Sequence, residues 1–554
     1  MKRLSIIFIF FFFVSRLPFD VSRIYAQQPT QEWVARYTGP YNDLYGPFLQ
    51  VDKAGNSYIA GTHVIGQYPN DSTCILCVKY NSSGVQLWAT LYRYPGYGYF
   101  VPTGLAIDSS GNAYVISGIA LTSVAPRNML IVKFNNLSGS PVWTKTYFGQ
   151  YSQSSFFDIK IDRLNNIYVV GSSDSSHLII RYNTNGDSVW VRKYHPSWLT
   201  AEYVRNCTID DSLNIIFTGQ RRFYYPPYGW YDSLLVAKYS STGVLRWESV
   251  YAYNVLGSDI GTKIIADQIG NSFIGGITTV SGNSVYFTLK YDRNGSRQWA
   301  RIYYPPGSTQ NDIYGIALDR INNALYVSGG AIESGIGMAT TIKYNVVTGD
   351  SLWVKRDTGS YNRGRARDIK LDTSGNIYIT GETYNFPSYA PYDIMTTKYS
   401  STGSKLWIMI YNWQYNGLDI GKAIAIDGQN NIYVLGTSQA GYQMFDYVVI
   451  KYNQTVGIKQ LSNELPLSYR LEQNYPNPFN PGTKFRIQIP KFSSVNITIF
   501  DVLGRAVENP VNEILKPGVY EIDINGLNYA SGTYFYRMTA DGNIIDTKKF
   551  VLIK

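Results

Sequence analysis

The sequence predicts an all-β protein, namely an eight-bladed β-propeller closed by its N-terminal strand and followed by a small C-terminal β-sandwich. Three features of the sequence support this fold class. The segment Asp372-Thr-Ser-Gly-Asn-Ile-Tyr-Ile-Thr-Gly381 has eight copies along the chain. An apolar run that ends in a cation and an aromatic residue recurs with it, as does a run that begins at Trp. A period of about 53 residues built from short strands is typical of a propeller.

The repeated segment has three fixed positions. Each copy starts with Asp, carries Asn four residues later, and has Gly where the following apolar run is expected to close. Asp and Asn favour turns because their side chains hydrogen-bond nearby backbone groups. We therefore expect a tight turn between two strands in every copy. The copies start at Asp52, Asp108, Asp162, Asp210, Asp267, Asp319, Asp372 and Asp427.

Each repeat is expected to form four strands, named A to D. Strand A carries small residues that suit a crowded axis, strand B follows the Asp–Asn turn, strand C ends in the cation and strand D begins at Trp. Alternating apolar residues favour strands over helices. The first D strand, Trp33–Tyr37, precedes every A strand, and the last A–B–C set, Ala423–Tyr452, lacks a D strand after it. Pairing the two would close the ring and remove an exposed sheet edge; the alternative is an open solenoid of the same units.

Residues 1–26 are predicted to be a signal peptide. Lys2 and Arg3 precede the apolar segment Ile6–Val14, which is too short to span a bilayer, and Ile24-Tyr-Ala26 offers a cleavage site. No later segment is predicted to cross a membrane, so the mature chain is expected to contain no integral membrane span. The formal charge is +10, but Lys and Arg are dispersed. Nucleic-acid binding needs a basic stripe, so no nucleic-acid partner is expected.

No catalytic residue, metal ligand or cofactor is predicted. The chain has three cysteines, an odd number that makes no disulfide framework in an exported protein. Cys74 and Cys77 lie three residues apart in a strand-like run and therefore point to opposite faces. The three histidines share no ligand-like spacing. Calcium at the Asp–Asn turns is an alternative, but each turn offers one dependable carboxylate and Ca²⁺ takes roughly six or more oxygens.

Ligand binding is expected on one face of the propeller. The short A–B and C–D turns share one face, which we call the plain face, and the B–C and D–A loops share the other, which we call the variable face. The variable-face loops are irregular and rich in aromatic residues, which give rigid contact area for sugars or proteins; alternatively, these rings only cover the blade ends. The candidate ligand-binding residues are Tyr97, Tyr99, Phe223, Tyr225, Tyr228, Trp230, Tyr384, Tyr389, Trp413 and Tyr415.

The repeats resemble the bacterial SBBP-type β-propeller repeat over residues 33–452. The best match runs from Asp368-Ile-Lys-Leu-Asp372 to Gly381 and continues with Thr383 and Phe386-Pro387. This resemblance implies a propeller, and the family has no agreed catalytic residues. Segments such as Thr242-Gly-Val-Leu-Arg-Trp247 also resemble the Thr-Gly-x-x-x-Trp repeat of quinoprotein-like propellers. The chain lacks their adjacent cysteines, so we expect shared blade geometry and no quinone cofactor.

Residues 467–554 closely resemble the type A C-terminal sorting domain of the type IX secretion system. The matching motifs include Leu471-Glu-Gln-Asn-Tyr-Pro-Asn-Pro-Phe-Asn-Pro481 and Ala530-Ser-Gly-Thr-Tyr-Phe-Tyr536. The resemblance implies passage through the periplasm, the type IX secretion machinery as partner, and release or attachment at the cell surface. The sorting motif comprises Asn474, Pro476, Asn477, Pro478, Phe479, Asn480 and Pro481.

The expected domains are the signal peptide at 1–26, the propeller at 27–453, a linker at 454–466 and the sorting domain at 467–554. The leading hypothesis is a secreted or cell-surface propeller that binds glycan or protein through its variable face. One alternative is an extracellular polysaccharide-degrading enzyme, a lyase or hydrolase, acting on the same face. A third hypothesis is a structural surface protein without a ligand.

Deleting residues 467–554 is expected to trap the protein in the periplasm, because the resemblance assigns outer-membrane translocation to this segment. Cell fractionation with surface protease treatment measures the outcome. A deletion variant that reaches the surface at the normal level would contradict the assignment.

Overall fold

The computed structural model confirms the all-β fold and the eight-bladed propeller. None of the described residues lies in a helix with the length and hydropathy to cross a bilayer. The chain divides into two compact units, one spanning Gln27–Leu461 and one containing Ser462–Val519 and Ile524–Lys554. The structure describes residues 29–38, 46–66, 72–122, 128–149, 154–194, 200–227, 229–253, 257–305, 307–359, 363–384, 392–413, 417–441, 444–453, 459–462, 465–480, 482–526 and 529–553.

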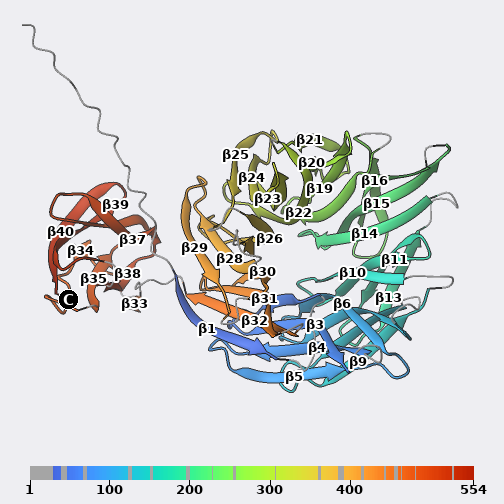
Figure 1. The fold of residues 1–554 in the computed structure, drawn as a ribbon, viewed down its shortest axis with the longest axis horizontal. Coiled ribbons are helices and arrows are strands. Elements are labelled where there is room, and N and C mark those ends of the chain that lie inside the picture. Colours follow the sequence, from blue (N-terminus) through green and yellow to red (C-terminus); the bar gives the residue numbers. More distant parts are fainter. Residues whose placement is uncertain are drawn as a thin grey trace, which may run out of the picture. The chain divides into compact units, whose positions relative to one another are not determined.

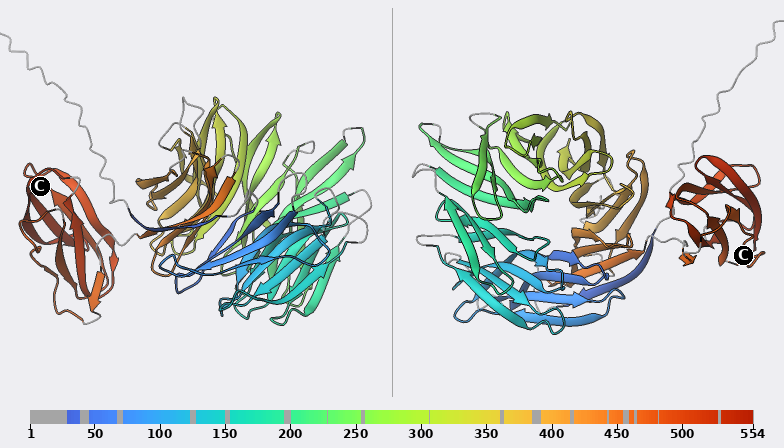
Figure 2. Two further views of the ribbon diagram at one scale, coloured as in Figure 1. Left: turned by 60° about the horizontal axis from the view of Figure 1, so that its bottom comes forward. Right: turned by 180° about the vertical axis from the view of Figure 1, so that it is seen from behind.

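Seven blades each consist of four consecutive antiparallel strands, in the order A to D from the axis outwards (Figures 1 and 2). Blades one to four are β2 (Phe48–Val51), β3 (Ser57–Ile65), β4 (Ser72–Tyr80), β5 (Gln86–Tyr92); β6 (Tyr99–Ile107), β7 (Ala113–Ala120), β8 (Asn128–Phe134), β9 (Pro141–Tyr147); β10 (Ser154–Ile161), β11 (Ile167–Ser173), β12 (Ser176–Tyr182), β13 (Ser188–Tyr194); β14 (Thr200–Ile209), β15 (Ile215–Tyr225), β16 (Gly229–Tyr239) and β17 (Leu245–Tyr251). Blades five to seven are β18 (Ile260–Ala266), β19 (Ser272–Val280), β20 (Asn283–Tyr291), β21 (Arg297–Tyr303); β22 (Ser308–Asp319), β23 (Ala324–Glu333), β24 (Ile336–Asn345), β25 (Ser351–Asp357); β26 (Gly364–Leu371), β27 (Ile377–Tyr384), β28 (Tyr392–Tyr399) and β29 (Lys405–Tyr411).

The eighth blade closes the ring with the N-terminal strand, as the strand count predicts. Its strands are β30 (Asp419–Ile426), β31 (Ile432–Gly441), β32 (Met444–Asn453) and β1 (Thr30–Tyr37). β1 pairs antiparallel with β32, from Thr30 opposite Asn453 to Tyr37 opposite Tyr447. The guanidinium of Arg36 also donates two hydrogen bonds to the buried carboxylate of Asp446, at 3.1 and 2.9 Å. Each A strand contacts the next around the axis, and β30 contacts β2.

The Asp–Asn segments form the expected turns. In blade seven, Asp372 Oδ1 accepts the backbone N–H groups of Ser374 and Asn376, and its Oδ2 accepts from the Asn376 amide and the Tyr378 hydroxyl. The strand-C cation Lys398 lies over the Tyr378 ring, 5.1 Å from its centroid. One carboxylate thus satisfies the turn and a buried tyrosine together. The same tyrosine–aspartate bond is present in blades one, two and eight, whereas Ile216 and Phe273 stand at this position in blades four and five.

The repeated glycine of strand B does not close the strand, contrary to the expectation from sequence. β27 continues through Gly381 to Tyr384. A β-bulge in strand A lies opposite this glycine, between Ala366 and Asp368. A Cβ atom at Gly381 would lie 1.8 Å from the carbonyl oxygen of Arg365. The glycine therefore recurs because the bulged backbone approaches it closely.

Neighbouring blades are joined by the tryptophan of strand D. The Trp190 indole donates to the carbonyl of Ser241, in the C–D turn of the next blade, at 2.9 Å. The ring also covers Gly243 of that turn, where a Cβ atom would lie 2.8 Å from the indole. Gly243 has φ +79°, so glycine is required both for the turn and for the ring. The same indole hydrogen bond occurs at Trp33, Trp88, Trp143, Trp190, Trp247, Trp299 and Trp353.

The hydrophobic core lies between blades. One cluster joins Ile116 and Met129 of blade two to Phe156, Ile159 and Leu178 of blade three, all almost fully buried. The three cysteines are buried and form no disulfide with one another, and Cys77 and Cys207 lie in such layers. Because each layer needs two adjacent blades, a single blade cannot bury its own apolar faces.

The C-terminal unit is a small β-sandwich. In one of its sheets β38, β35 and β34 lie side by side in that order, and in the other the order is β37-β36-β39-β40. Its apolar residues alternate along the strands, and Ile487, Ile497 and Tyr536 are fully buried between the sheets. The strands after the eighth blade are β33 (Lys459–Ser462), β34 (Arg470–Leu471), β35 (Gly482–Ile489), β36 (Ser493–Phe500), β37 (Ala506–Leu515), β38 (Gly518–Asn525), β39 (Gly532–Ala540) and β40 (Asn543–Leu552).

Removing residues 27–40 is expected to lower the melting temperature by roughly 5 °C or more, because β1 completes the last blade and stabilises the ring. Differential scanning calorimetry of the purified chain measures the change. Removal of residues 27–29 alone, which leaves β1 in place, is the control. An unchanged melting temperature for the longer deletion would show that closure by β1 is dispensable.

Candidate functional site

Exposed aromatic side chains gather on the variable face. Among the described propeller residues, seven aromatic side chains are more than a third exposed. All seven lie at the ends of B or D strands, at the starts of C strands or in the segments that join D to A. They are therefore on the face that the strand order assigns to the variable loops. These residues are Phe148, Tyr194, Tyr224, Trp230, Tyr253, Tyr304 and Tyr392.

The aromatic residues predicted as ligand-binding are spread around the ring and differ in exposure. Trp230 is 56% exposed at the tip of the β15–β16 hairpin, where its ring lies 5.1 Å from that of Tyr224. Tyr97, Tyr99 and Phe223 are half-buried.

Trp413 is also half-buried, and the guanidinium of Arg36 lies 3.9 Å from its ring centroid. Tyr225 and Tyr384 belong to β15 and β27, but their side chains lie outside the described part of the structure. Tyr228, Tyr389 and Tyr415 fall entirely outside the described residues.

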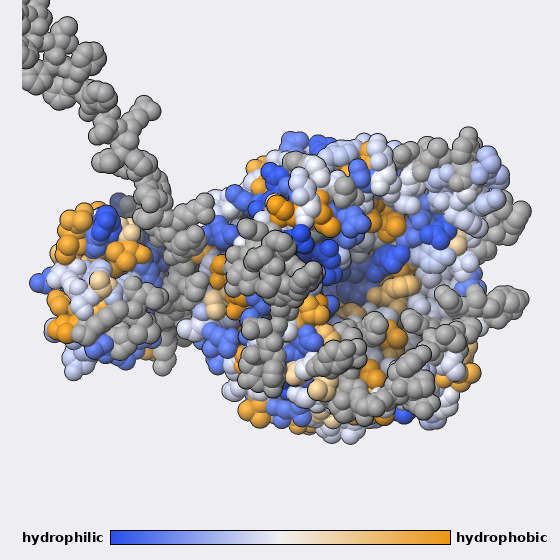
Figure 3. Space-filling view, in the orientation of Figure 1, coloured by the Kyte–Doolittle hydropathy of each residue, from blue (hydrophilic) through white to orange (hydrophobic). Residues whose placement is uncertain are grey.

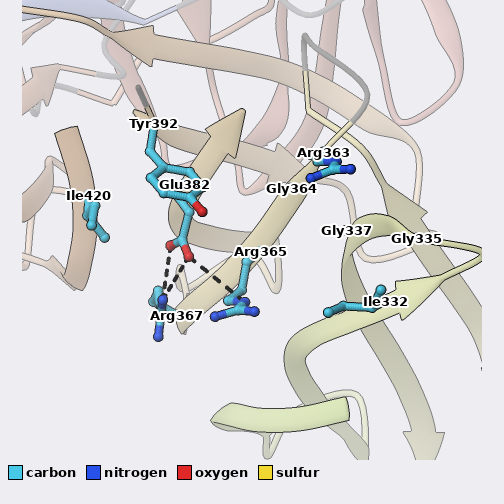
Figure 4. Close-up of a pocket in the computed structure, with 10 residues that line it drawn as sticks. All are labelled: Ile332, Gly335, Gly337, Arg363, Gly364, Arg365, Arg367, Glu382, Tyr392 and Ile420. Atoms are coloured by element: carbon cyan, nitrogen blue, oxygen red, sulfur yellow. Dashed lines mark hydrogen bonds and ion pairs between the residues drawn. The ribbon is translucent and has the colours of Figure 1, made fainter. Parts of the chain in front are cut away.

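A pocket of about 220 Å³ opens on the variable face between blades six and seven (Figure 4). We call it the arginine pocket. β26 and the residue before it contribute alternate arginines, the β23–β24 hairpin forms the opposite wall, and Glu382 of β27 lies between the two guanidinium groups of Arg365 and Arg367 (Figure 4). The lining residues are Ile332, Gly335, Gly337, Arg363, Gly364, Arg365, Arg367, Glu382, Tyr392 and Ile420.

Positive charge exceeds negative charge in the arginine pocket. Arg367 donates to Glu382 through Nε at 3.0 Å and Nη2 at 2.7 Å, and Arg365 Nε lies 3.9 Å from the same carboxylate. Burial opposes the charge of Arg367, but its hydrogen bonds and ion pair with Glu382 outweigh this and raise its pKa. Burial lowers the pKa of the nearby Lys422, and the charge of Arg367 lowers it further. The pocket therefore favours an anionic ligand.

The arginine pocket was not predicted from the sequence. Its signal in the sequence is the alternation Arg363-Gly-Arg365-Ala-Arg367, because alternate residues of a strand share a face. The bulge between Ala366 and Asp368 changes that register, and the opposite wall comes from blade six. Neither feature is evident from a single repeat.

Hydrophilic side chains, with apolar ones beside them, line the hollow at the centre of the propeller (Figure 3). Two acids of the innermost strands are already paired. Asp158 binds Lys160 at 2.6 Å and accepts the backbone N–H of Cys207 in the next blade at 3.0 Å. Asp368 binds Lys370 at 3.0 Å and accepts from the backbone of Ile424 at 3.1 Å. These acids therefore link adjacent A strands.

A second charged cluster is buried between blades three and four. His177, Glu202 and Glu248 bring potential metal-ligand atoms within 4.8 Å of one another. Arg221 Nη2 also hydrogen-bonds Glu248 at 2.6 Å, and Arg221 Nε donates to Glu202 at 2.6 Å. Burial raises the pKa of Glu202, but His177 and Arg221 outweigh this and lower it. A guanidinium among the acids does not fit a cation site, and His177 and Glu202 are fully buried from any substrate.

The plain face carries exposed aliphatic side chains that the sequence analysis did not anticipate. Its turns present Leu137, Leu164, Ile269, Ile321 and Val347, each more than 60% exposed. The repeated Asp and Asn side chains between them are occupied in hydrogen bonds within their own turns, as in blade three. A pocket of about 170 Å³ lies on this face between blades five and six.

The predicted sorting motif packs along the last strand of the C-terminal unit. Phe479 is buried against Phe550, its N–H donates to the Val551 carbonyl at 3.0 Å, and Asn477 Oδ1 accepts from the Val551 N–H at 2.9 Å. The buried Asn474 amide donates to Thr483 at 2.9 Å. Pro476, Pro478 and Asn480 are exposed, and Pro481 lies outside the described residues.

Residues 473–554 match the family described as "Secretion system C-terminal sorting domain". This match confirms the sorting domain and indicates export by the type IX secretion system, so the protein is secreted or displayed on the cell surface. The secretion machinery is therefore a partner of the chain. A search of curated proteins finds no match to the chain.

Solved structures with similar folds are distant. A structure of Sqt1 from Chaetomium thermophilum bound to the N-terminus of ribosomal protein L10 is 10% identical, with 76% of this chain and 100% of that chain covered and a TM-score of 0.49. The polysaccharide lyase Uly1 is 10% identical over 79% of this chain and 94% of that chain, with a TM-score of 0.40. A protein of unknown function from Dyadobacter fermentans is 11% identical over 77% and 99%, with a TM-score of 0.36. These similarities are too weak to indicate a ligand or an activity.

Asp393→Asn is expected to stabilise the propeller at pH 7.5 by about 1–3 kcal/mol. Burial and the nearby Asp419 raise the pKa of Asp393 from 3.8 to about 6. The protonated carboxyl therefore contributes stability below pH 4 that is lost as the pH rises through 6. Thermal melts between pH 4 and 8 should show a gain that shrinks towards pH 4.

Asp446→Asn is the matched control for this variant. Asp446 is equally buried but pairs with Arg36 at 2.9 Å, so its loss should lower the melting temperature at pH 7.5. If Asp393→Asn destabilises the propeller at that pH, the buried carboxylate is stabilising and the expected sign is wrong.

Proposed function

We propose that this protein is a secreted or cell-surface binding protein whose propeller holds a glycan or protein ligand on its variable face. The observation that carries the proposal is the placement of the exposed aromatic rings. All seven in the described propeller are on that face. Aromatic rings at a rigid surface give large contact area at low conformational cost. The SBBP-type resemblance of the repeats supports a scaffold role and adds no catalytic residue.

The distribution of polar groups supports the same face. On the plain face the repeated Asp, Asn and Tyr side chains hydrogen-bond one another, as Asp108, Asn112 and Tyr114 do in blade two. On the variable face, charged side chains that do not recur between blades line a pocket. Groups already satisfied within a scaffold have little to offer a ligand, whereas a pocket with excess charge has unused capacity.

Binding is tested with the purified full chain on a glycan array and against extracellular protein preparations, followed by titration of each ligand found. Trp230→Ala and Tyr304→Ala are expected to weaken binding, with roughly tenfold loss for the ring that contacts the ligand. Release of reducing ends or unsaturated products from polysaccharides is measured in parallel, because turnover would favour the enzyme hypothesis.

The matched controls are Leu164→Ala and Ile321→Ala, which remove exposed apolar side chains from the plain face. They should leave the affinity within about twofold, since the scaffold is unchanged. Loss of binding in these variants, together with full binding in the aromatic variants, would place the ligand on the plain face and overturn the proposal.

A further inference from the structure

The arginine pocket has the chemistry of a specific anion site, and the inference from it rests on the proposed function of the variable face. We propose that the pocket binds the acidic group of one residue in a polysaccharide chain, as a uronate carboxylate or a sulfate ester. A carboxylate is planar and a sulfate ester is tetrahedral, but each can present two oxygens to the two N–H groups of a guanidinium fork.

The charges of the pocket are incompletely neutralised. Glu382 is the carboxylate between Arg365 and Arg367, and its side chain is 7% exposed. Arg367 donates hydrogen bonds to both carboxylate oxygens of Glu382, and its guanidinium lies 4.9 Å from the centroid of the Tyr314 ring. Arg365 has an ion pair with Glu382 at 3.9 Å and no hydrogen bond to its side chain among the described residues. An anionic ligand would accept hydrogen bonds from the guanidinium of Arg365. It would also offset the repulsion between the positive charges of Lys422 and Arg367.

The neighbouring blade holds Arg365 in the pocket. Its stem crosses strand β23 at Gly330, where a Cβ atom would lie 2.8 Å from Arg365 Cγ. Glycine at this position therefore clears the path for the arginine. The side chain remains 36% exposed, so its guanidinium is accessible to a ligand.

The shape of the pocket favours one sugar residue of a longer chain. A volume of about 220 Å³ is below the roughly 300–1,000 Å³ typical of sites that enclose a whole small molecule. The wall opposite the arginines carries Gly335 and Gly337, and no heavy atom lies within 4 Å of a Cβ position at Gly335. A polysaccharide chain can therefore enter and leave the pocket across that turn.

The apolar surface beside the arginines favours an acidic sugar over an acidic peptide as the ligand. Ile332, Ile420 and the 37% exposed ring of Tyr392 line the pocket with the charged groups. A pyranose ring offers both an acidic substituent and an apolar C–H face to such a surface. An acidic peptide offers the carboxylate without a ring face to lie on Tyr392.

A bound polysaccharide could reach a second contact site, at the aromatic residues that follow the outer strands of blades four and five. The Ser334 N–H, in the turn that walls the pocket, donates to the Gly307 carbonyl at 3.4 Å. Tyr304, three residues before Gly307, is 50% exposed, and its hydroxyl lies 3.3 Å from that of Tyr253. These two exposed rings can hold a neighbouring sugar residue of a bound chain.

The test compares matched polymers with the full chain by affinity electrophoresis and calorimetry. Dextran sulfate is paired with dextran, and polygalacturonate is paired with its fully methyl-esterified form. At least one acidic polymer should bind, its neutral partner should not, and the affinity should fall as salt is raised. Binding of dextran sulfate alone identifies a sulfate site, and binding of polygalacturonate alone identifies a carboxylate site; either result supports the inference.

Two variants alter the pocket by different means. Arg365→Gln removes a donor and its charge. Gly337→Val adds volume to the pocket without a charge change, and a Cβ atom at this position meets its nearest heavy atoms at 3.4–3.8 Å, which is ordinary contact. Each should weaken acidic-polymer binding about tenfold. The control Arg356→Gln makes the same charge change outside the pocket lining, where Arg356 pairs with Glu333 at 3.2 Å, and should stay within about twofold. Melting curves verify that each variant is folded.

The outcomes separate this inference from the proposed function. A ligand whose binding is unaffected by both pocket variants overturns the inference and leaves the variable face as the binding face. Poly-glutamate binding that depends on Arg365, without binding of either acidic polysaccharide, overturns the sugar assignment. If Arg356→Gln weakens acidic-polymer binding as much as Arg365→Gln does, the loss reflects general surface charge, and this result also overturns the inference. A protein that binds no glycan and no protein fails the proposed function itself.

Discussion

The contact between a strand-D tryptophan and the C–D turn of the next blade is the interaction on which the ring depends. At the seven junctions that the structure describes, the indole donates to a turn carbonyl and covers a glycine that no other residue could replace without displacing the ring. In six blades the strand-C cation donates to the same carbonyl as the indole. At the closure, Trp33 of β1 makes this contact with Ser82 and Gly84 of blade one. The N-terminal strand is therefore held both by its partner strand and by the neighbouring blade.

This construction divides the molecule into a scaffold and a surface. The residues that recur satisfy one another within turns or across blade junctions, so they have little hydrogen-bonding capacity left for a ligand. The residues that differ between blades are free to specify chemistry, and they lie where loops of unequal length meet. The arginine pocket follows this pattern. Its arginines belong to blade seven and its glycine-lined wall belongs to blade six.

Much of the fold was predictable, and the reasons are local. Asp and Asn four residues apart define a turn by their own side chains. The surplus D strand at Trp33 matched the one set without a D strand, which favoured a closed ring over an open solenoid. The role of Gly381 was not predictable, since the bulge that presses Arg365 against it belongs to another strand. The arginine pocket was missed for a similar reason. Its arginines and the wall opposite them come from blades seven and six, Ile420 comes from blade eight, and Gly330 matters only because Arg365 crosses it.

The aromatic residues mark the limit of sequence reasoning about the site. Trp230 and Trp413 both occur in variable-face segments rich in aromatic residues, yet one is exposed at a hairpin tip and the other lies under the guanidinium of Arg36. By itself, the sequence determined the number of blades and the sorting domain, because both depend on motifs whose residues are close together in the chain. It also indicated the closing strand, although β1 and β32 are far apart in the chain, because the count leaves one D strand over and one blade without it. The tertiary structure alone decided which side chains are occupied and which are available. Whether a side chain is available depends on contacts between blades, whose matching positions are about 50 residues apart in the chain. These contacts form only when the ring closes.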